Sequence, residues 1–208
     1  MDPQPRFFTT LAAIQPLEPA LTTALHTRVR PERWPAHHRL LEAGQVARRL
    51  YFLESGLVRG YTLRQGREVS SWFMREGDFV LSIASFFTQT PSEECLELLE
   101  PGHGFSVSYE QLQQLYLDFP AFNFHGRVLT ERYYVLSEAR ARHLRAQSAA
   151  ERYAQLLRDF PAVFQRVSVS TSPRIWAWRQ KPSAACAVAA KDPCRATKMI
   201  LVRISASC

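Results

Sequence analysis

The sequence of 208 residues has no apolar run long enough to cross a lipid bilayer. Its first 19 residues contain four prolines and lack the basic start and unbroken apolar stretch of a secretory signal peptide. We therefore expect a cytoplasmic protein. Hydrophobic residues make up 46% and aromatic residues 12% of the chain, a composition that favours a globular protein over a disordered one.

Lysine is absent from the first 167 residues, and cysteine occurs there once, as Cys95. An iron–sulfur sensor needs a cluster of cysteines, so this part of the chain excludes one, and a lone cysteine in a strand is most often a buried small apolar residue. His37, His38 and His103 lack the His-x-His pair and spaced acid of a cupin metal site. No P-loop, nucleophile elbow or paired-histidine zinc motif occurs either. We therefore expect neither an enzyme nor a metal site, and we name no catalytic residue.

The net charge of +7 comes almost entirely from the end of the chain. Residues 168–208 contain seven basic residues and one acid, whereas the preceding 167 residues contain 19 arginines and 18 acids. The same end segment holds all three lysines and three of the four cysteines, and it has no Phe or Tyr. A change of composition of this kind is typical of a linker or a disordered tail.

Residues 34–107 consist of short apolar runs separated by glycines, which predicts an all-β sandwich or barrel. Residues 64–67 predict a hairpin tip with Gly66 at positive φ. Helical spacing predicts one or two short helices over 9–27, interrupted by prolines, a helical turn within 80–87, a helix over 109–116 and a long helix over 121–145. A capping box at residues 148–151 predicts the start of a further helix that ends at Pro161.

This order of parts resembles the transcription regulators of the Crp/Fnr type. The segments that carry the resemblance are Leu40-Leu41-Glu42-Ala43-Gly44, Leu50-Tyr51-Phe52-Leu53, Gly56-Leu57-Val58-Arg59, Glu76-Gly77-Asp78-Phe79, Glu151-Arg152-Tyr153 and Phe164-Gln165-Arg166-Val167. The resemblance covers roughly residues 15–167. It implies a mainly β plus α protein with a jelly-roll sensor domain, a long helix that pairs two subunits, and a winged helix-turn-helix that enters the major groove of DNA.

The resemblance divides the chain into four parts. Residues 9–120 form a cyclic-nucleotide-binding-like jelly roll with an N-terminal helix, and residues 121–146 form the dimerisation helix. Residues 147–167 form the first helix of a truncated winged helix-turn-helix, and residues 168–208 form an irregular, disordered tail.

We interpret the tail as translated out of frame from about residue 170. When the reading is shifted back by one base, the codons allowed by Thr171 to Val188 permit HIASYLGVAPETLSRLRR, which resembles the missing helix-turn-helix. Trp176 followed by Ala177 leaves only glycine at the predicted turn. The alternative is a natural tail whose codon compatibility is coincidental.

The resemblance also suggests where a ligand would bind. Relatives that bind cyclic nucleotides use a Gly-Glu pair after a barrel strand and, about ten residues later, an arginine for the phosphate. This chain has Gly77-Asp78 at the turn and Ser92-Glu93-Glu94-Cys95 where the arginine is expected, and an acidic pair there repels a phosphate. Arg75 is better explained as a solvated strand-edge charge. The candidate pocket residues are Gly77, Asp78, Phe79, Ser85, Glu94 and Cys95.

We therefore expect no ordinary cyclic-AMP site, because no phosphate-binding arginine is found. The pocket holds either a different effector, which the sequence does not identify, or none. No other cofactor is implied.

The long helix provides the predicted homodimer contact. Leu129, Tyr133, Leu136 and Leu144 form an apolar stripe that either pairs two copies of the chain or packs on its own barrel. The sequence thus predicts a ligand-sensing transcription regulator whose DNA binding is present in the frame-intact protein and lost in the printed chain, with no membrane partner. The alternative is a stand-alone sensor and dimerisation module without DNA binding.

Overall fold

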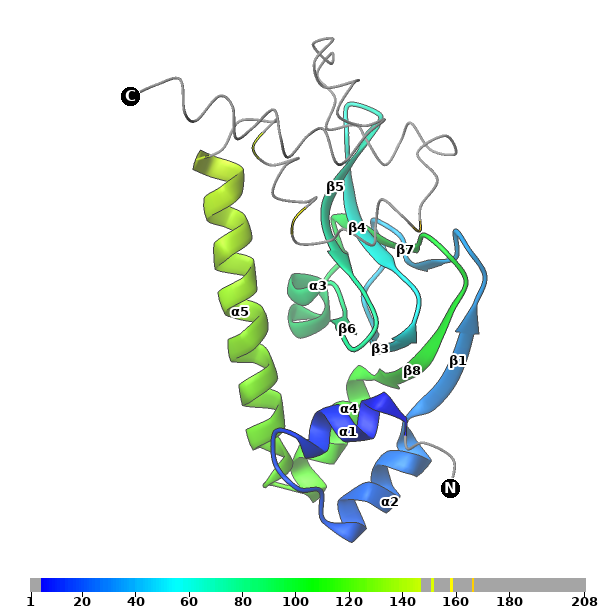
Figure 1. Cartoon of the computed structure of the whole chain (residues 1–208), viewed down its shortest axis with the longest axis vertical. Coiled ribbons are helices and arrows are strands. Elements are labelled where there is room, and N and C mark those ends of the chain that lie inside the picture. Colours follow the sequence, from blue (N-terminus) through cyan, green and yellow to red (C-terminus); the bar gives the residue numbers. More distant parts are fainter. Residues whose placement is uncertain (1–4, 147–150, 152–157, 159–165, 167–208) are drawn as a thin grey trace.

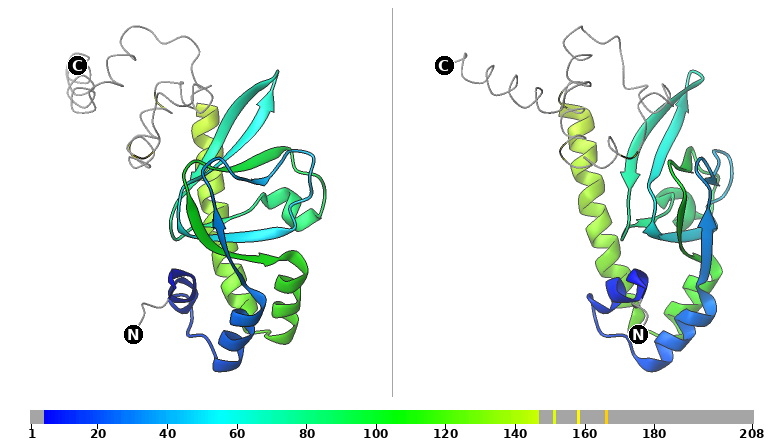
Figure 2. Two further views of the ribbon diagram at one scale, coloured as in Figure 1. Left: turned by 90° about the vertical axis from the view of Figure 1, so that its right-hand side faces the viewer. Right: turned by 45° about the vertical axis from the view of Figure 1, so that its right-hand side comes forward.

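The computed structural model describes residues 5–146 together with Glu151, Arg158 and Arg166 (Figure 1). Two antiparallel sheets form a β-roll, with short helices at one end and a long helix along one side (Figures 1 and 2). The elements are α1 (Arg6–Ala12), α2 (Pro19–Arg28), β1 (Arg30–Trp34), β2 (Arg39–Leu41), β3 (Arg49–Ser55), β4 (Val58–Arg64), β5 (Arg67–Met74), β6 (Phe79–Val80), α3 (Ile83–Thr88), β7 (Glu94–Leu98), β8 (Gly102–Ser108), α4 (Tyr109–Asp118) and α5 (Phe122–Ala146).

The two sheets have the strand orders β1-β8-β3-β6 and β2-β7-β4-β5. Every strand pairing is antiparallel, and consecutive strands often lie in different sheets, as in a jelly roll. Alternate residues of each strand therefore face the space between the sheets. The structure confirms the predicted all-β roll over residues 34–107, including its jelly-roll type.

The predicted N-terminal helical region consists of two helices. Helix α1 ends at Ala12, before Pro16, and α2 begins at Pro19. The carboxylate of Glu54 accepts the backbone N–H groups of Arg6 (2.9 Å) and Phe7 (2.7 Å) at the start of α1. The ring of Phe7 packs edge-on against Phe52 of β3. These contacts hold α1 against the first sheet.

The hairpin tip between β4 and β5 confirms the predicted turn. Gly66 has φ of 73°, and Gln65 also has positive φ, 51°.

A capping box starts α4: the Ser108 hydroxyl accepts the Gln111 N–H (3.2 Å), and the Gln111 side chain accepts the Ser108 N–H (3.1 Å).

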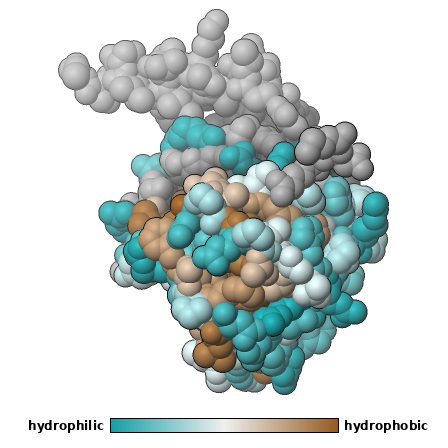
Figure 3. All heavy atoms as spheres, turned by 90° about the horizontal axis from the view of Figure 1, so that it is seen from below, coloured by the Kyte–Doolittle hydropathy of each residue, from teal (hydrophilic) through white to brown (hydrophobic). Residues whose placement is uncertain are grey.

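Helix α5 is continuous over 25 residues, as predicted, and runs along the side of the roll (Figures 1 and 2). The predicted capped helix after residue 147, the helix-turn-helix and the out-of-frame tail fall outside the described residues. Among the helices that the structure describes, none is long and apolar enough to span a membrane. Viewed from the lower end, apolar surface gathers between hydrophilic side chains (Figure 3).

Candidate ligand site

The turn between β5 and β6 carries three of the six predicted pocket residues: Gly77, Asp78 and Phe79. Gly77 has φ of 87°, and its N–H donates to the carbonyl of Leu53 (2.8 Å). The Phe79 N–H donates to the hydroxyl of Tyr133 on α5 (2.8 Å), and that hydroxyl lies 3.5 Å from Asp78 Oδ1. This turn therefore docks the long helix onto the roll.

The other three predicted pocket residues have different surroundings. Ser85 is buried in α3, where its hydroxyl accepts the N–H of Ala47 (2.8 Å). Cys95 is buried in β7 and its sulfur accepts the N–H of Ala43 (3.3 Å). Its neighbour Glu94 points to the opposite face of the strand. Cys95 and Glu94 thus face opposite sides of β7, whereas Asp78 and Glu94 both lie near Arg140.

Glu94 belongs to a polar cluster between the sheets that we name the Trp72 cluster, formed by Trp72, Ser82, Ser92 and Glu94. Trp72 Nε1 donates to Glu94 Oε2 (2.9 Å). The hydroxyls of Ser82 and Ser92, both buried, lie 3.0 Å apart. The Ser92 hydroxyl also bonds the backbone N–H (3.1 Å) and C=O (2.9 Å) of Glu94. The cluster therefore fixes the start of β7 against β5 and α3.

The indole of Trp72 lies directly over Gly60 of β4. A Cβ atom at Gly60 would lie 2.1 Å from the indole Cε2, far inside van der Waals contact. Trp72 is half-buried and packs against the core, so its ring fills the interior of the roll beside β4. A flat ligand entering this space has to displace the ring. This pair was not predicted from the sequence, although a glycine inside a strand is a known signal for a close approach.

The Trp72 cluster interacts with one side chain of α5, Arg140, which lies near Glu94. Burial lowers the pKa of Arg140, and the nearby Asp78, Tyr133 and Glu94 oppose that shift by attraction. Burial raises the pKa of Glu94, opposed by its bonds to Ser82 and Trp72 and by Arg140. The cluster and Arg140 thus connect the interior of the roll to the long helix.

The expected phosphate-binding segment contributes no positive charge to the roll. Ser92 is buried in the Trp72 cluster, Glu93 is exposed, and Glu94 alone of the acidic pair points inward. Arg75 lies at the surface, where its backbone N–H donates to Asp78 Oδ2 (3.0 Å). Arg140 on α5 is the basic group that faces Glu94.

The predicted dimer stripe divides between two environments. Leu129 and Tyr133 are half-buried and pack against the core of their own chain. Leu136 is 39% exposed, and the side chain of Leu144 lies outside the described residues. The neighbouring Val135 is 63% exposed.

A buried group of ion pairs lies on the face of β7 opposite to Glu94 and includes Glu97 of that strand. Arg59 Nη2 donates to Glu68 (2.6 Å) and to Glu97 (2.7 Å), and its guanidinium lies 4.2 Å from the ring centre of Tyr61. Removing one partner of such a buried group is strongly destabilising, so we assign it a structural role.

Two loops of the roll converge on one described residue beyond α5. Arg166 forms ion pairs with Glu76, between β5 and β6, and with Glu100, between β7 and β8. The hydrogen bond from Arg166 lowers the pKa of Glu76 to about 2.

Within the described residues, no group of three or more His, Cys, Asp or Glu side chains is placed to hold a metal ion.

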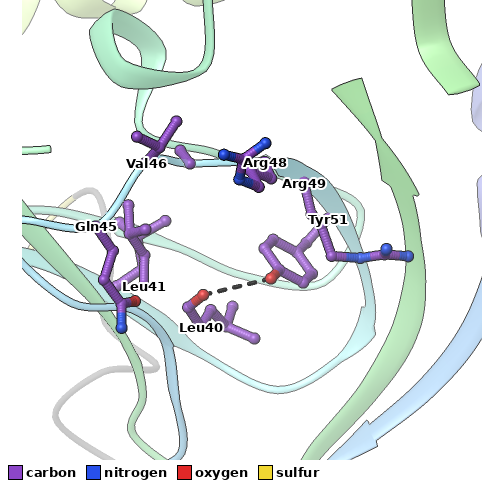
Figure 4. A pocket seen from close by; sticks show the side chains of 9 residues that line it. Leu40, Leu41, Gln45, Val46, Arg48, Arg49 and Tyr51 are labelled. Carbon is purple, nitrogen blue, oxygen red and sulfur yellow. Dashed lines mark hydrogen bonds between the residues drawn. The ribbon is translucent and has the colours of Figure 1, made fainter. Parts of the chain in front are cut away.

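A cavity of about 190 Å³ lies between β2, β3 and the loop that joins them (Figure 4). None of the six predicted pocket residues lines it. Its lining residues are Leu40, Leu41, Gln45, Val46, Ala47, Arg48, Arg49, Tyr51 and Leu96.

Comparison with known proteins identifies the roll. Residues 31–119 match the family model of the cyclic nucleotide-binding domain. A comparison with curated proteins finds no significant match.

Solved structures share the fold. The Xanthomonas campestris protein described as the c-di-GMP responsive global regulator CLP superposes with a TM-score of 0.56 at 21% identity, over 75% of this chain and 74% of that one. The catabolite activator protein of Thermus thermophilus gives 0.53 at 18% identity, over 72% and 71%. A CooA mutant from Carboxydothermus hydrogenoformans gives 0.52 at 17% identity, over 69% and 92%. The predicted resemblance of the sensor half to Crp/Fnr-type regulators is confirmed at the level of the fold.

Proposed function

We propose that this chain is a ligand-sensing transcription regulator of the Crp/Fnr type, that two copies pair through α5, and that DNA binding is lost in the printed sequence. One observation carries the proposal: a cyclic nucleotide-binding-type roll is fastened to one face of a 25-residue helix, whose opposite side presents apolar residues to solvent. A long helix with two apolar faces suits a protein in which the state of the roll changes how two subunits pair.

The spacing along α5 separates the two faces. Leu129, Tyr133 and Arg140 follow intervals of four and seven residues and face the roll of their own chain. Val128 and Val135, seven residues apart, lie about 120–140° around the helix from the centre of that face, and the exposed Phe124, which precedes Val128 by four residues, lies about 160° from it. Apolar residues at intervals of four and seven are typical of a helix that packs against a second helix.

The dimer is tested by the mass of the full chain in solution. We expect twice the chain mass of 23.8 kDa for the wild type and the monomer mass for Val135→Glu, because a carboxylate in a helix–helix seam is desolvated without a partner. Tyr134→Glu is the matched control, because Tyr134 is 65% exposed and lies about 100° away from Val135. It should remain dimeric. A monomeric wild type contradicts the pairing.

The DNA-binding part of the proposal concerns residues outside the described range. We expect a frame-corrected chain to shift a specific fragment of promoter DNA in a gel, whereas the printed chain should not. Binding by the printed chain that is salt-sensitive and indifferent to sequence would report only the charge of its last 41 residues. Binding of the printed chain to a specific DNA sequence contradicts the proposed loss of DNA binding. Failure of the corrected chain to bind favours the stand-alone sensor and dimerisation module.

The effector, in this proposal, is not a cyclic nucleotide. The indole of Trp72 occupies the interior space, and the inward-facing group at the expected phosphate position is the carboxylate of Glu94. An acid there opposes a phosphate diester. Because the Xanthomonas campestris relative is described as responsive to c-di-GMP, calorimetry should include this dinucleotide beside cyclic AMP and cyclic GMP. We expect no binding heat from any of the three.

A further inference from the structure

Apolar side chains form one part of the wall of the cavity between β2 and β3. Leu41 and Leu96 are buried, and the buried ring of Tyr51 is held by its hydroxyl, which donates to the carbonyl of Leu40 (3.3 Å; Figure 4). Its volume of about 190 Å³ equals the share of roughly six water molecules in the liquid, at about 30 Å³ each. The space therefore suits a small ligand with an apolar body.

The lining residues that carry charge are both basic. Arg49 is held in place, since it donates to the Ser106 hydroxyl (2.6 and 3.0 Å) and lies 3.6 Å from Glu32. Arg48 is exposed, and its backbone carbonyl accepts the N–H of Tyr109 (2.8 Å). Its guanidinium makes no hydrogen bond or ion pair with the part of the chain that the structure describes, and its charge acts on Glu110 at the start of α4 only from a distance. No acidic residue lines the cavity. An unpaired guanidinium beside an apolar space is suited to a carboxylate, which it binds through two parallel hydrogen bonds.

We propose that this cavity is the effector site and that its ligand is a small organic anion, with an apolar body in the cavity and a carboxylate on Arg48. The inference rests on the proposed function, because a sensor whose interior is filled by Trp72 needs its effector elsewhere.

The wall of the cavity connects directly to the Trp72 cluster. The carbonyl of Gln45 accepts the N–H of Ser92 (2.8 Å), and the N–H of Ala47 donates to Ser85 of α3 (2.8 Å). Ser92 in turn bonds Glu94, which faces Arg140 of α5. A ligand that moves the wall at residues 45–47 therefore acts on Glu94, which interacts with Arg140 of the long helix. This is a contiguous path of packed and hydrogen-bonded groups from cavity to helix.

The test is a titration of the full chain with sodium benzoate, followed by amide chemical shifts in NMR. Benzoate is a probe of the proposed class, and benzyl alcohol is its neutral counterpart of nearly equal size. We expect benzoate, added up to about 20 mM, to shift the amides of residues 45–47 and of Ser92, and benzyl alcohol to bind at least about tenfold more weakly. Arg48→Gln should weaken the binding of benzoate by about tenfold or more, because it removes a charge-assisted hydrogen bond.

Two further variants control the experiment. Arg33→Gln removes an exposed arginine of β1 that does not line the cavity, and it should leave benzoate affinity unchanged. Val46→Phe places a larger side chain at the cavity and should abolish binding even where Arg48 is present. Far-UV circular dichroism confirms that each variant is folded.

The proposal is overturned if benzoate does not bind, if it binds the wild type and Arg48→Gln equally, if benzyl alcohol binds as tightly, or if the shifted amides lie elsewhere. These outcomes leave the proposed function standing. Binding of cyclic AMP in a parallel titration would instead contradict the clause of the proposed function that excludes a cyclic-nucleotide effector, whatever benzoate does.

Discussion

Replacing Gly60 with alanine tests the central packing feature of the roll. The new Cβ atom would lie 2.1 Å from the indole of Trp72, and Gly60 does not adopt a positive φ, so the backbone itself accepts alanine. The clash therefore has to be relieved by moving the indole. Overpacking of a core costs about 1–3 kcal/mol. Loss of the Trp72–Glu94 hydrogen bond, whose acceptor is a carboxylate, costs about a further 1.5–3 kcal/mol.

We expect Gly60→Ala to lower the free energy of unfolding by about 3 kcal/mol, measured by urea denaturation of the full chain. The control is the same substitution in a Trp72→Ala background, where no ring is present to clash. There it should cost less than about 0.5 kcal/mol, because alanine has lower conformational entropy in the unfolded chain than glycine. The coupling between the two sites is then about 2.5 kcal/mol or more.

Trp72→Ala alone removes a large side chain and costs about 3–5 kcal/mol, a large fraction of the stability of a typical domain. If that variant does not fold, Trp72→Leu provides the background, since leucine retains apolar volume without a ring above Gly60. Equal costs of Gly60→Ala in the wild type and in the variant background would refute the packing argument.

Three other perturbations test single contacts. Tyr133→Phe leaves the Phe79 N–H without its acceptor, so the free energy of unfolding should fall by about 1–3 kcal/mol and hydrogen exchange at Phe79 should quicken; unchanged exchange there contradicts the docking of α5. Glu76 has a pKa of about 2 instead of 4.5, so the stability from its ion pair with Arg166 is present above pH 4.5 and is lost as the pH falls towards 2. In urea titrations across this range, the stability difference between wild type and Glu76→Gln should shrink with falling pH, and a constant difference contradicts the ion pair. Ser108→Ala removes the cap of α4 and should cost about 1 kcal/mol in thermal or urea unfolding, whereas a change below a few tenths would show that the cap is not formed.

The sequence predicted the parts of the fold whose signals are local. Turn glycines and alternating apolar runs marked the strands, and Gly66 marked the hairpin tip because few other residues adopt positive φ. Helical spacing placed the start of α5 within one residue.

The sites could not be predicted equally well, because they depend on which surfaces face each other. Spacing alone did not show that Leu129 and Tyr133 face their own roll, since two stripes on one helix look alike in sequence. The link between Trp72 and Glu94 joins residues 22 positions apart in different strands, and the pairing of β4 with both β5 and β7 brings them together. Gly60 was the one local signal for this pair.

The direct test of the account is isothermal titration calorimetry of the wild-type chain with cyclic AMP, followed at the same time by tryptophan fluorescence. With the indole of Trp72 held over Gly60 and the carboxylate of Glu94 beside it, we predict no saturable heat and no change in emission up to about 1 mM, a free energy of binding weaker than about −4 kcal/mol. Saturable binding at micromolar concentrations, accompanied by a change in tryptophan emission, would contradict it.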